Sequence, residues 1–278
     1  MPNLVSPSLS LSAAVSWGAA DFSGGIATRQ SNVFSVVVIA HATGLLFMLL
    51  LALLSREPML SATSLLWGLA AGAAGGAGLA CLYKALAIGK MGLTAPLSAV
   101  ITALVPLAFS FGTQGLPRRG QLFGFVLAVV SIWLIARQSG AANGSAGLGL
   151  AVAAGVGFGG FLLFIKFAGA QAVFWPLVAA RTASLILMIA IIAAGRGEWR
   201  LARGTLWYVL LAGVLDSGAN ALYVAATQHG RLDVAAVLSS LYPASTVLLA
   251  RVVLRERLSR LQSAGMATAL VAVALIAS

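Results

Sequence analysis

Residues 66–83 have the sequence LWGLAAGAAGGAGLACLY, and a related sequence, LWYVLLAGVLDSGANALY, stands 140 positions later at residues 206–223. Both copies begin with Leu-Trp, end with Leu-Tyr and lie in long apolar segments. After one inserted residue the match continues through Ser98 and Ser239, Arg119 and Arg260, and Gln121 and Gln262. Apolar segments share Ala and Leu by chance, but paired Trp, Tyr, Arg and Gln in the same order indicate a duplication.

The composition indicates a membrane protein. Of the 278 residues, 60% are hydrophobic and 8% are charged, whereas about 25% of residues are charged in soluble domains. The net charge of +11 is spread over short connections and forms no single basic face, so we expect lipid as a partner and no nucleic acid. The single cysteine, Cys81, excludes an intrachain disulfide.

Apolar runs of about twenty residues predict membrane-spanning helices, because a helix pairs its backbone donors where water is absent. We predict ten spans, at residues 9–28, 33–54, 64–88, 93–114, 120–136, 146–168, 173–194, 204–226, 232–254 and 261–277. A polar Gly/Ser/Asn stretch at residues 137–145 separates two repeats, 1–140 and 141–278. Because five spans per repeat is odd, the second repeat is inverted. The predicted fold is an all-α integral membrane protein of two inverted five-helix repeats, an architecture typical of transporters.

Ten spans place both termini on the same side of the membrane. Nine Lys and Arg residues lie in the odd-numbered connections between spans and five in the even-numbered ones. This bias predicts that the odd-numbered connections face the cytoplasm.

Polar side chains inside the spans are the best candidates for a site, because burying them costs a few kcal/mol unless they face a partner or a wet cavity. Asp216, Asn220 and Tyr223 share one face of the eighth span, and Trp17 and Asp21 share one face of the first. Such stripes suit a small amphipathic ligand. The predicted substrate-binding residues are Trp17, Tyr83, Ser98, Asn220, Tyr223, Ser239 and Tyr242. For a single serine or threonine, the alternative is a hydrogen bond back to a helix carbonyl.

We predict a coupling or a structural role for five ionisable residues in the spans, namely Asp21, His41, Lys84, Arg181 and Asp216. Asp21 is either a proton-coupling carboxylate or a hydrated group near the membrane surface. Lys84 either pairs with a carboxylate or extends to the surface. Asp216 is a second candidate for proton coupling. His41 and Arg181 are 140 residues apart, which favours a shared structural role, such as tying a helix end to a neighbour's carbonyls, over substrate contact.

The sequence shows no catalytic motif: there is no Walker loop, no Gly-x-Ser-x-Gly and no cluster with metal-ligand spacing. The two histidines, His41 and His229, stand in unrelated contexts. We therefore expect neither enzymatic activity nor a cofactor or metal.

Several motifs resemble those of the EamA-type transporters of the drug/metabolite transporter superfamily, and within it the YddG-like amino-acid exporters. They are Trp17-Gly18 in the first span, Leu-Tyr near the end of spans three and eight, and the segment from Arg257 to Gly265. The resemblance implies a basket-shaped ten-helix carrier with a central cavity and with the fifth and tenth spans packed outside. It also implies amino-acid export and cytoplasmic termini, the latter in conflict with the loop charges. Arg181 matches the family's arginine, whereas His41 replaces it in the first half.

The expected function is a secondary transporter that exports amino acids, aromatic ones included, and related small metabolites by alternating access across a bacterial inner membrane. One alternative is a proton-coupled drug or nucleotide-sugar antiporter of the same fold. Another is a non-transporting membrane scaffold. We expect a monomer, with a homodimer as the alternative.

Overall fold

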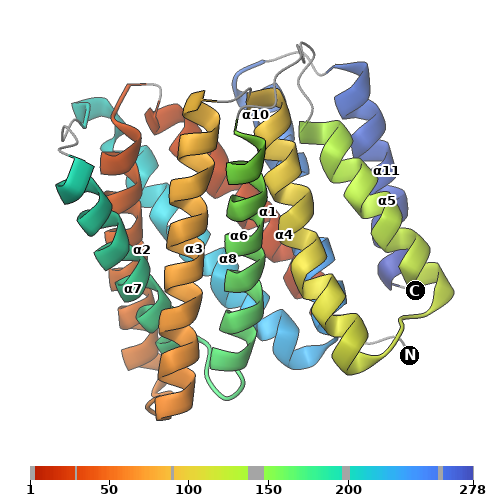
Figure 1. Ribbon diagram of the computed structural model, residues 1–278, viewed down its shortest axis with the longest axis horizontal. Coiled ribbons are helices and arrows are strands. Elements are labelled where there is room, and N and C mark those ends of the chain that lie inside the picture. Colours follow the sequence, from red (N-terminus) through yellow and green to blue (C-terminus); the bar gives the residue numbers. More distant parts are fainter. Residues whose placement is uncertain are drawn as a thin grey trace.

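The computed structural model describes residues 4–28, 30–88, 91–136, 147–195, 201–255 and 259–277, which contain helices and no strand. The helices are α1 (Val5–Thr28), α2 (Val33–Ser55), α3 (Ala62–Ile88), α4 (Met91–Gln114), α5 (Arg119–Ala136), α6 (Leu148–Ala168), α7 (Phe174–Gly195), α8 (Leu206–His229), α9 (Leu232–Ser239), α10 (Tyr242–Val253) and α11 (Arg260–Ala277), with a 3-10 turn at Arg203–Thr205 before α8. They stand side by side as one bundle (Figure 1).

The outer surface of the bundle is apolar. Leu54 is 69% exposed, Trp207 70% and Leu270 74%, and large apolar side chains exposed in such numbers fit lipid better than water. Within the described residues, six helical segments are long and apolar enough to cross a membrane. The protein is therefore a multi-pass membrane protein. Each predicted span coincides with one helix or, for the ninth, with a pair of helices; that all ten cross the membrane stays a prediction.

The ninth predicted span is broken into α9 and α10 at Ser240 and Leu241. Pro243 follows, and a proline has no backbone N–H to donate to the carbonyl four residues earlier. The chain tightens there, because the Leu241 N–H donates to the Leu238 carbonyl at 3.2 Å and the Ala244 N–H to the Leu241 carbonyl at 3.0 Å. A broken helix in a membrane is tolerated where it is buried in protein or lines a cavity.

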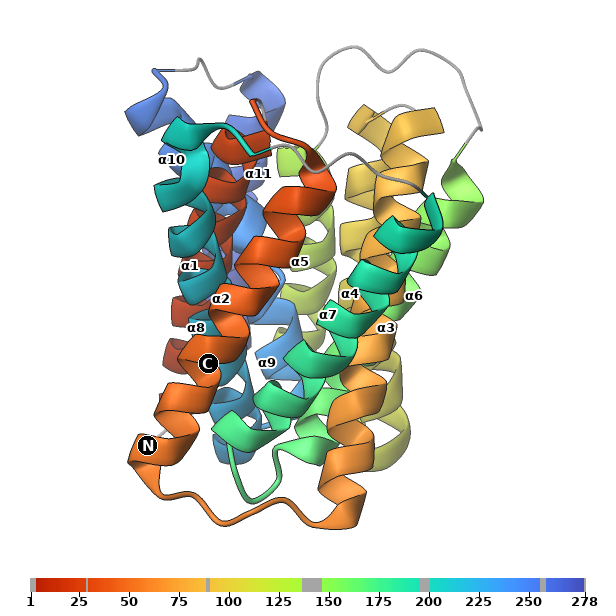
Figure 2. The same ribbon diagram turned by 90° about the vertical axis from the view of Figure 1, so that its left-hand side faces the viewer.

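The two halves pack against each other through equivalent contacts. Helix α3 of the first half packs against α6 and α7 of the second, and α8 of the second half packs against α1 and α2 of the first (Figure 2). A Cβ atom at Gly72 would meet the Ala180 carbonyl on α7, and one at Gly213 would meet the Ala40 carbonyl on α2. Ala40 and Ala180 are 140 positions apart. Small residues thus bring the backbones together at matching places in both halves.

Helices α5 and α11 form a pair at one edge of the bundle (Figure 1). The Ser131 hydroxyl on α5 donates to the Gly265 carbonyl on α11 at 2.8 Å, and the Gln121 amide donates to the Ile276 carbonyl at 3.3 Å. This is the outside position that the family resemblance implies. It leaves the remaining helices to surround the centre.

Candidate substrate cavity

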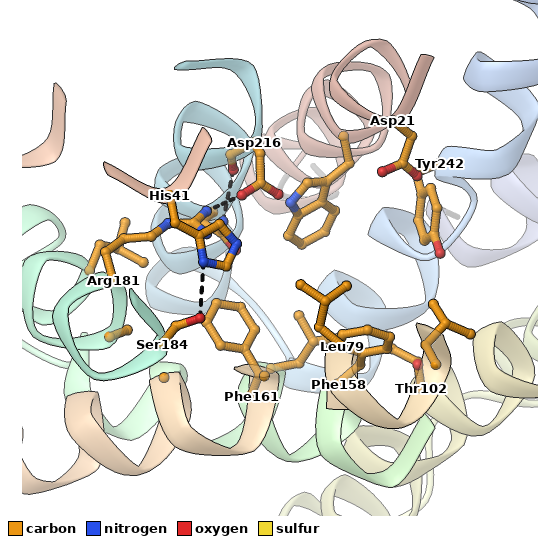
Figure 3. A pocket seen from close by; sticks show the side chains of 18 of the residues that line it. Asp21, His41, Leu79, Thr102, Phe158, Phe161, Arg181, Ser184, Asp216 and Tyr242 are labelled. Atoms are coloured by element: carbon orange, nitrogen blue, oxygen red, sulfur yellow. Dashed lines mark hydrogen bonds and ion pairs between the residues drawn. The ribbon is translucent and has the colours of Figure 1, made fainter. Parts of the chain in front are cut away.

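A cavity of about 350 Å³ lies at the centre of the bundle (Figure 3). Its walls come from α1, α2, α3, α4, α6, α7, α8 and α10 and from the break before α10, so both halves contribute. Small-molecule sites typically have volumes of about 300–1,000 Å³. The cavity is therefore large enough for a small metabolite.

Four polar residues gather at one end of the cavity (Figure 3). The guanidinium of Arg181 on α7 donates a hydrogen bond to the carboxylate of Asp216 on α8, while Nδ1 of His41 lies 3.0 Å from the Ser184 hydroxyl. The Arg181 side chain is 10% exposed and that of Asp216 36%. Arg181 is thus already paired, and an anion that approached it would compete with Asp216.

Asp21 and Tyr242 lie at the other end of the cavity (Figure 3), and Trp17 also lines it. Trp17 and Asp21 are one helical turn apart on α1 and share a face. The rings of Trp17 and Tyr242 meet edge to face, with centroids 6.5 Å apart. The carboxylate of Asp21, beside Tyr242 in Figure 3, is exposed to the cavity, and no described residue forms a hydrogen bond or an ion pair with it.

Apolar side chains line the wall between the two ends. They are Leu79 on α3, Phe158, Phe161 and Leu162 on α6, and Leu177 on α7. Gly75 makes room for one of these rings, since a Cβ there would stand 3.2 Å from Phe161. The cavity therefore joins two polar ends by an aromatic and aliphatic wall, which suits an amphipathic molecule.

Three predicted binding residues lie outside the lining. Tyr223 is fully buried, and its hydroxyl donates to the Leu162 carbonyl at 3.1 Å. Ser239 is also fully buried and donates to the Ser10 carbonyl at 3.1 Å. Ser98 is 3% exposed, and its hydroxyl has no hydrogen-bond partner among the described residues. Tyr223 and Ser239 thus bond to neighbouring helices in this structure, and their part in substrate binding stays a prediction.

Two further predicted residues, Tyr83 and Lys84, lie on α3, but their side chains fall outside the described part of the chain. Asn220 does line the cavity, although its amide donates back to the Asp216 carbonyl at 2.8 Å. His41 and Arg181 face the cavity and bond to the side chains of Ser184 and Asp216 rather than to the carbonyls of a helix end.

The apolar wall was not anticipated from the sequence. Phe158 and Phe161 lie among the glycines of α6, where a phenylalanine carries no signal that separates a cavity wall from lipid contact. Ser184 and Ser240 were missed for a similar reason, since buried serines usually bond to their own helix. Only the glycines beside the two phenylalanines could have indicated close packing there.

The connection between α2 and α3 in the first half is hydrogen-bonded to the second half. Glu57, in that connection, accepts hydrogen bonds from the backbone N–H groups of Val173 and Phe174 at the start of α7, both at 2.9 Å. A carboxylate there satisfies free donors and complements the positive end of the helix dipole. Glu57 therefore holds the first half against the second.

A second link between the halves involves Arg231, between α8 and α9. Its guanidinium donates to the carbonyls of Gln114 at 3.1 Å and Gly115 at 2.9 Å. It also donates to Asp233 at 2.7 Å, and this hydrogen bond raises the pKa of Arg231.

Aromatic rings from both halves also pack against one another. The ring of Trp67 lies 5.4 Å from that of Phe164 and 5.2 Å from that of Phe167, and Phe109 meets Phe167 at 5.5 Å. Trp67 and Phe109 belong to the first half, and the other two to the second. Polar and aromatic contacts thus both join the two halves.

Comparison with known proteins agrees with this architecture. The model of the EamA-like transporter family matches twice, at residues 6–137 and 145–278. A solved structure, titled only "Crystal structure of protein", aligns with a TM-score of 0.75 at 17% identity, covering 97% of this chain and 95% of that one, so the two share a fold. No curated protein matches. With both halves matched, the chain belongs to the EamA-like transporter family and is a membrane transporter built from two EamA repeats.

Proposed function

We propose that this transporter exports amino acids, aromatic ones among them, and related small metabolites across the bacterial inner membrane by alternating access. One observation carries the proposal: a central cavity, walled by both repeats, has charged groups at its ends and aromatic side chains between them. An amphipathic solute that carries a charged group, as an amino acid does, needs both kinds of surface. No motor domain is required, since inverted repeats can exchange an open and a closed end at nearly equal energy.

Contacts between the two halves support the alternating-access part of this proposal. The links made by Glu57 and Arg231 and the rings around Trp67 join the first half to the second. If one half moves against the other, these contacts have to change. A carrier has to break and remake such contacts in every cycle.

A second candidate is a proton-coupled drug or nucleotide-sugar antiporter of the same fold. Asp21 favours it, because its carboxylate faces the cavity without a described hydrogen-bond partner. Such a carboxylate can bind either a proton or a cationic solute, and competition between the two would couple their movements.

Flux measurements in reconstituted liposomes test both candidates. The panel contains labelled Phe, Trp, Met and Thr, each with and without a pH gradient. We expect saturable uptake of at least one amino acid, reduced by Trp17→Ala and retained in Trp207→Ala, whose side chain is 70% exposed on the outer surface. Flux of all four no greater than into empty vesicles would refute amino-acid export. Gradient-driven flux that Asp21→Asn renders insensitive to the gradient would favour proton coupling.

A further inference from the structure

We propose that the cavity recognises its substrate through a cationic amine, held by Asp21 beside the rings of Trp17 and Tyr242, and does not recognise the substrate's carboxylate. The inference rests on the proposed function, because it assumes that the cavity carries small metabolites. It adds the chemical group that decides whether a metabolite is accepted.

The charges of the described lining do not cancel. Among the described residues that line the cavity, the charged groups are Asp21, Arg181 and Asp216. Arg181 and Asp216 form an ion pair, so their charges offset one another. Asp21 remains, and no described residue forms an ion pair with it. The described lining therefore carries one carboxylate in excess and favours a cationic group.

Aromatic side chains lie near the Asp21 carboxylate. Trp17 precedes Asp21 by one turn of α1, and its ring meets that of Tyr242 edge to face at 6.5 Å. Figure 3 places Asp21 directly beside Tyr242. Aromatic faces attract ammonium groups, most strongly where water is scarce. One compact ammonium group at this place would contact the carboxylate and the aromatic rings together.

The described lining offers no unpaired cationic group to the carboxylate of an amino acid. Arg181 is the only cationic side chain in the described lining, and its guanidinium is 10% exposed and bonded to Asp216. A substrate carboxylate would have to displace Asp216 to reach it. At the other end of the cavity the same carboxylate would meet Asp21 and be repelled. An amine without a carboxylate therefore loses nothing, whereas an acid without an amine loses its main contact.

Three compounds with the same phenyl ring separate these groups: L-phenylalanine, phenethylamine, which lacks the carboxylate, and 3-phenylpropionic acid, which lacks the amine. Each competes with labelled phenylalanine for transport by the full chain in liposomes. We expect phenethylamine to inhibit at concentrations similar to those of phenylalanine, and 3-phenylpropionic acid to need at least about tenfold more. Because labelled phenylalanine carries the same amine, Asp21→Asn should abolish phenylalanine transport itself, and its loss of phenethylamine binding is measured by calorimetric titration. Asp21→Glu should retain both, and Trp207→Ala serves as the control.

The outcomes separate this inference from the proposed function. If phenylalanine is transported but phenethylamine fails to compete, or 3-phenylpropionic acid competes equally well, the inference is wrong and amino-acid export stands. If none of labelled Phe, Trp, Met and Thr is transported, amino-acid export fails, and calorimetric titration of phenethylamine into the detergent-solubilised protein decides the inference alone. Binding that Asp21→Asn abolishes and Asp21→Glu keeps supports it; no binding to the parent protein overturns it. Should Asp21→Asn not fold, the three-compound comparison on the parent protein still decides.

Discussion

Arg181 on α7 is bonded to Asp216 on α8 at the wall of the central cavity. Both residues belong to the second half, and the positions 140 residues earlier hold His41 and Gly76. These two positions of the first half therefore cannot form a matching ion pair. A scaffold with closely similar contacts in its two halves thus encloses a site whose two ends differ chemically, which lets one substrate orientation be preferred.

Asp216→Ala should destabilise the protein, because it leaves the Arg181 guanidinium buried without its partner. Because the Asp216 side chain is 36% exposed, we expect a loss of about 1–2 kcal/mol, less than for a fully buried pair, seen as a melting temperature lower by roughly 2–8 °C in detergent. Replacing both residues by apolar ones, Arg181→Met with Asp216→Leu, should restore most of the loss, since the unpaired charge is gone. A single variant as stable as the parent would show that the ion pair contributes nothing.

Glu57→Ala should free the start of α7. The N–H groups of Val173 and Phe174 lose their acceptors, so their amide hydrogens should exchange faster, with a cost of about 1–2 kcal/mol. Glu57→Gln, which keeps one acceptor oxygen, should give an intermediate rate. The Leu232 N–H, which donates to the Gln114 side chain, serves as an internal reference. Unchanged exchange at Val173 and Phe174 would argue against this link between the halves.

Gly72→Ala should impair folding, because its Cβ would overlap the Ala180 carbonyl of the facing helix. Overpacking of this kind costs about 1–3 kcal/mol. Gly112→Ala is the matched control, as nothing lies within 4 Å of a Cβ at that position. Melting temperature and monodispersity in detergent distinguish the two variants. Equal behaviour would mean that the helices around α3 can separate freely.

Tyr223→Phe should cost about 0.5–1.5 kcal/mol through the lost hydrogen bond to the Leu162 carbonyl. It should leave the KM for substrate unchanged, because Tyr223 does not line the cavity. Trp17→Ala should instead raise KM about tenfold through the lost ring contact. Transport kinetics measured beside thermal melting separate the two effects. A raised KM in Tyr223→Phe would show that the Tyr223 hydroxyl contributes to substrate binding.

The helices were largely predictable from the sequence, because apolar runs of membrane length have few alternatives. The predicted span 33–54 is α2, Val33–Ser55, in the structure. The break between α9 and α10 was not predicted, although Pro243 signals it. Whether a proline kinks a helix or divides it depends on what its neighbours offer in place of the lost hydrogen bond, and those neighbours are distant in sequence.

The site was predictable where a costly side chain marks it. Trp17 with Asp21, and Asp216 with Asn220, were placed on common faces by helical spacing and do line the cavity. Tyr223, on the same side of α8 as Asp216, turns against α6 instead, because a helix face is wider than the cavity it borders. The partners of buried hydroxyls, such as Ser10 for Ser239, lie on other helices, and spacing along one helix cannot reveal them.

Alternating access requires that one cavity is reached from the two sides of the membrane in turn. Labelling tests it directly, with Leu79→Cys placed in a Cys81→Ser background, since Leu79 lines the cavity and Cys81 is the only native cysteine. Ile186→Cys, at a position 63% exposed on the outer surface, is the lipid-facing control. A membrane-impermeant thiol reagent should modify the cavity cysteine from either side of oriented vesicles, more slowly with substrate present, and should spare the control. Modification from one side alone, with and without substrate, would contradict alternating access.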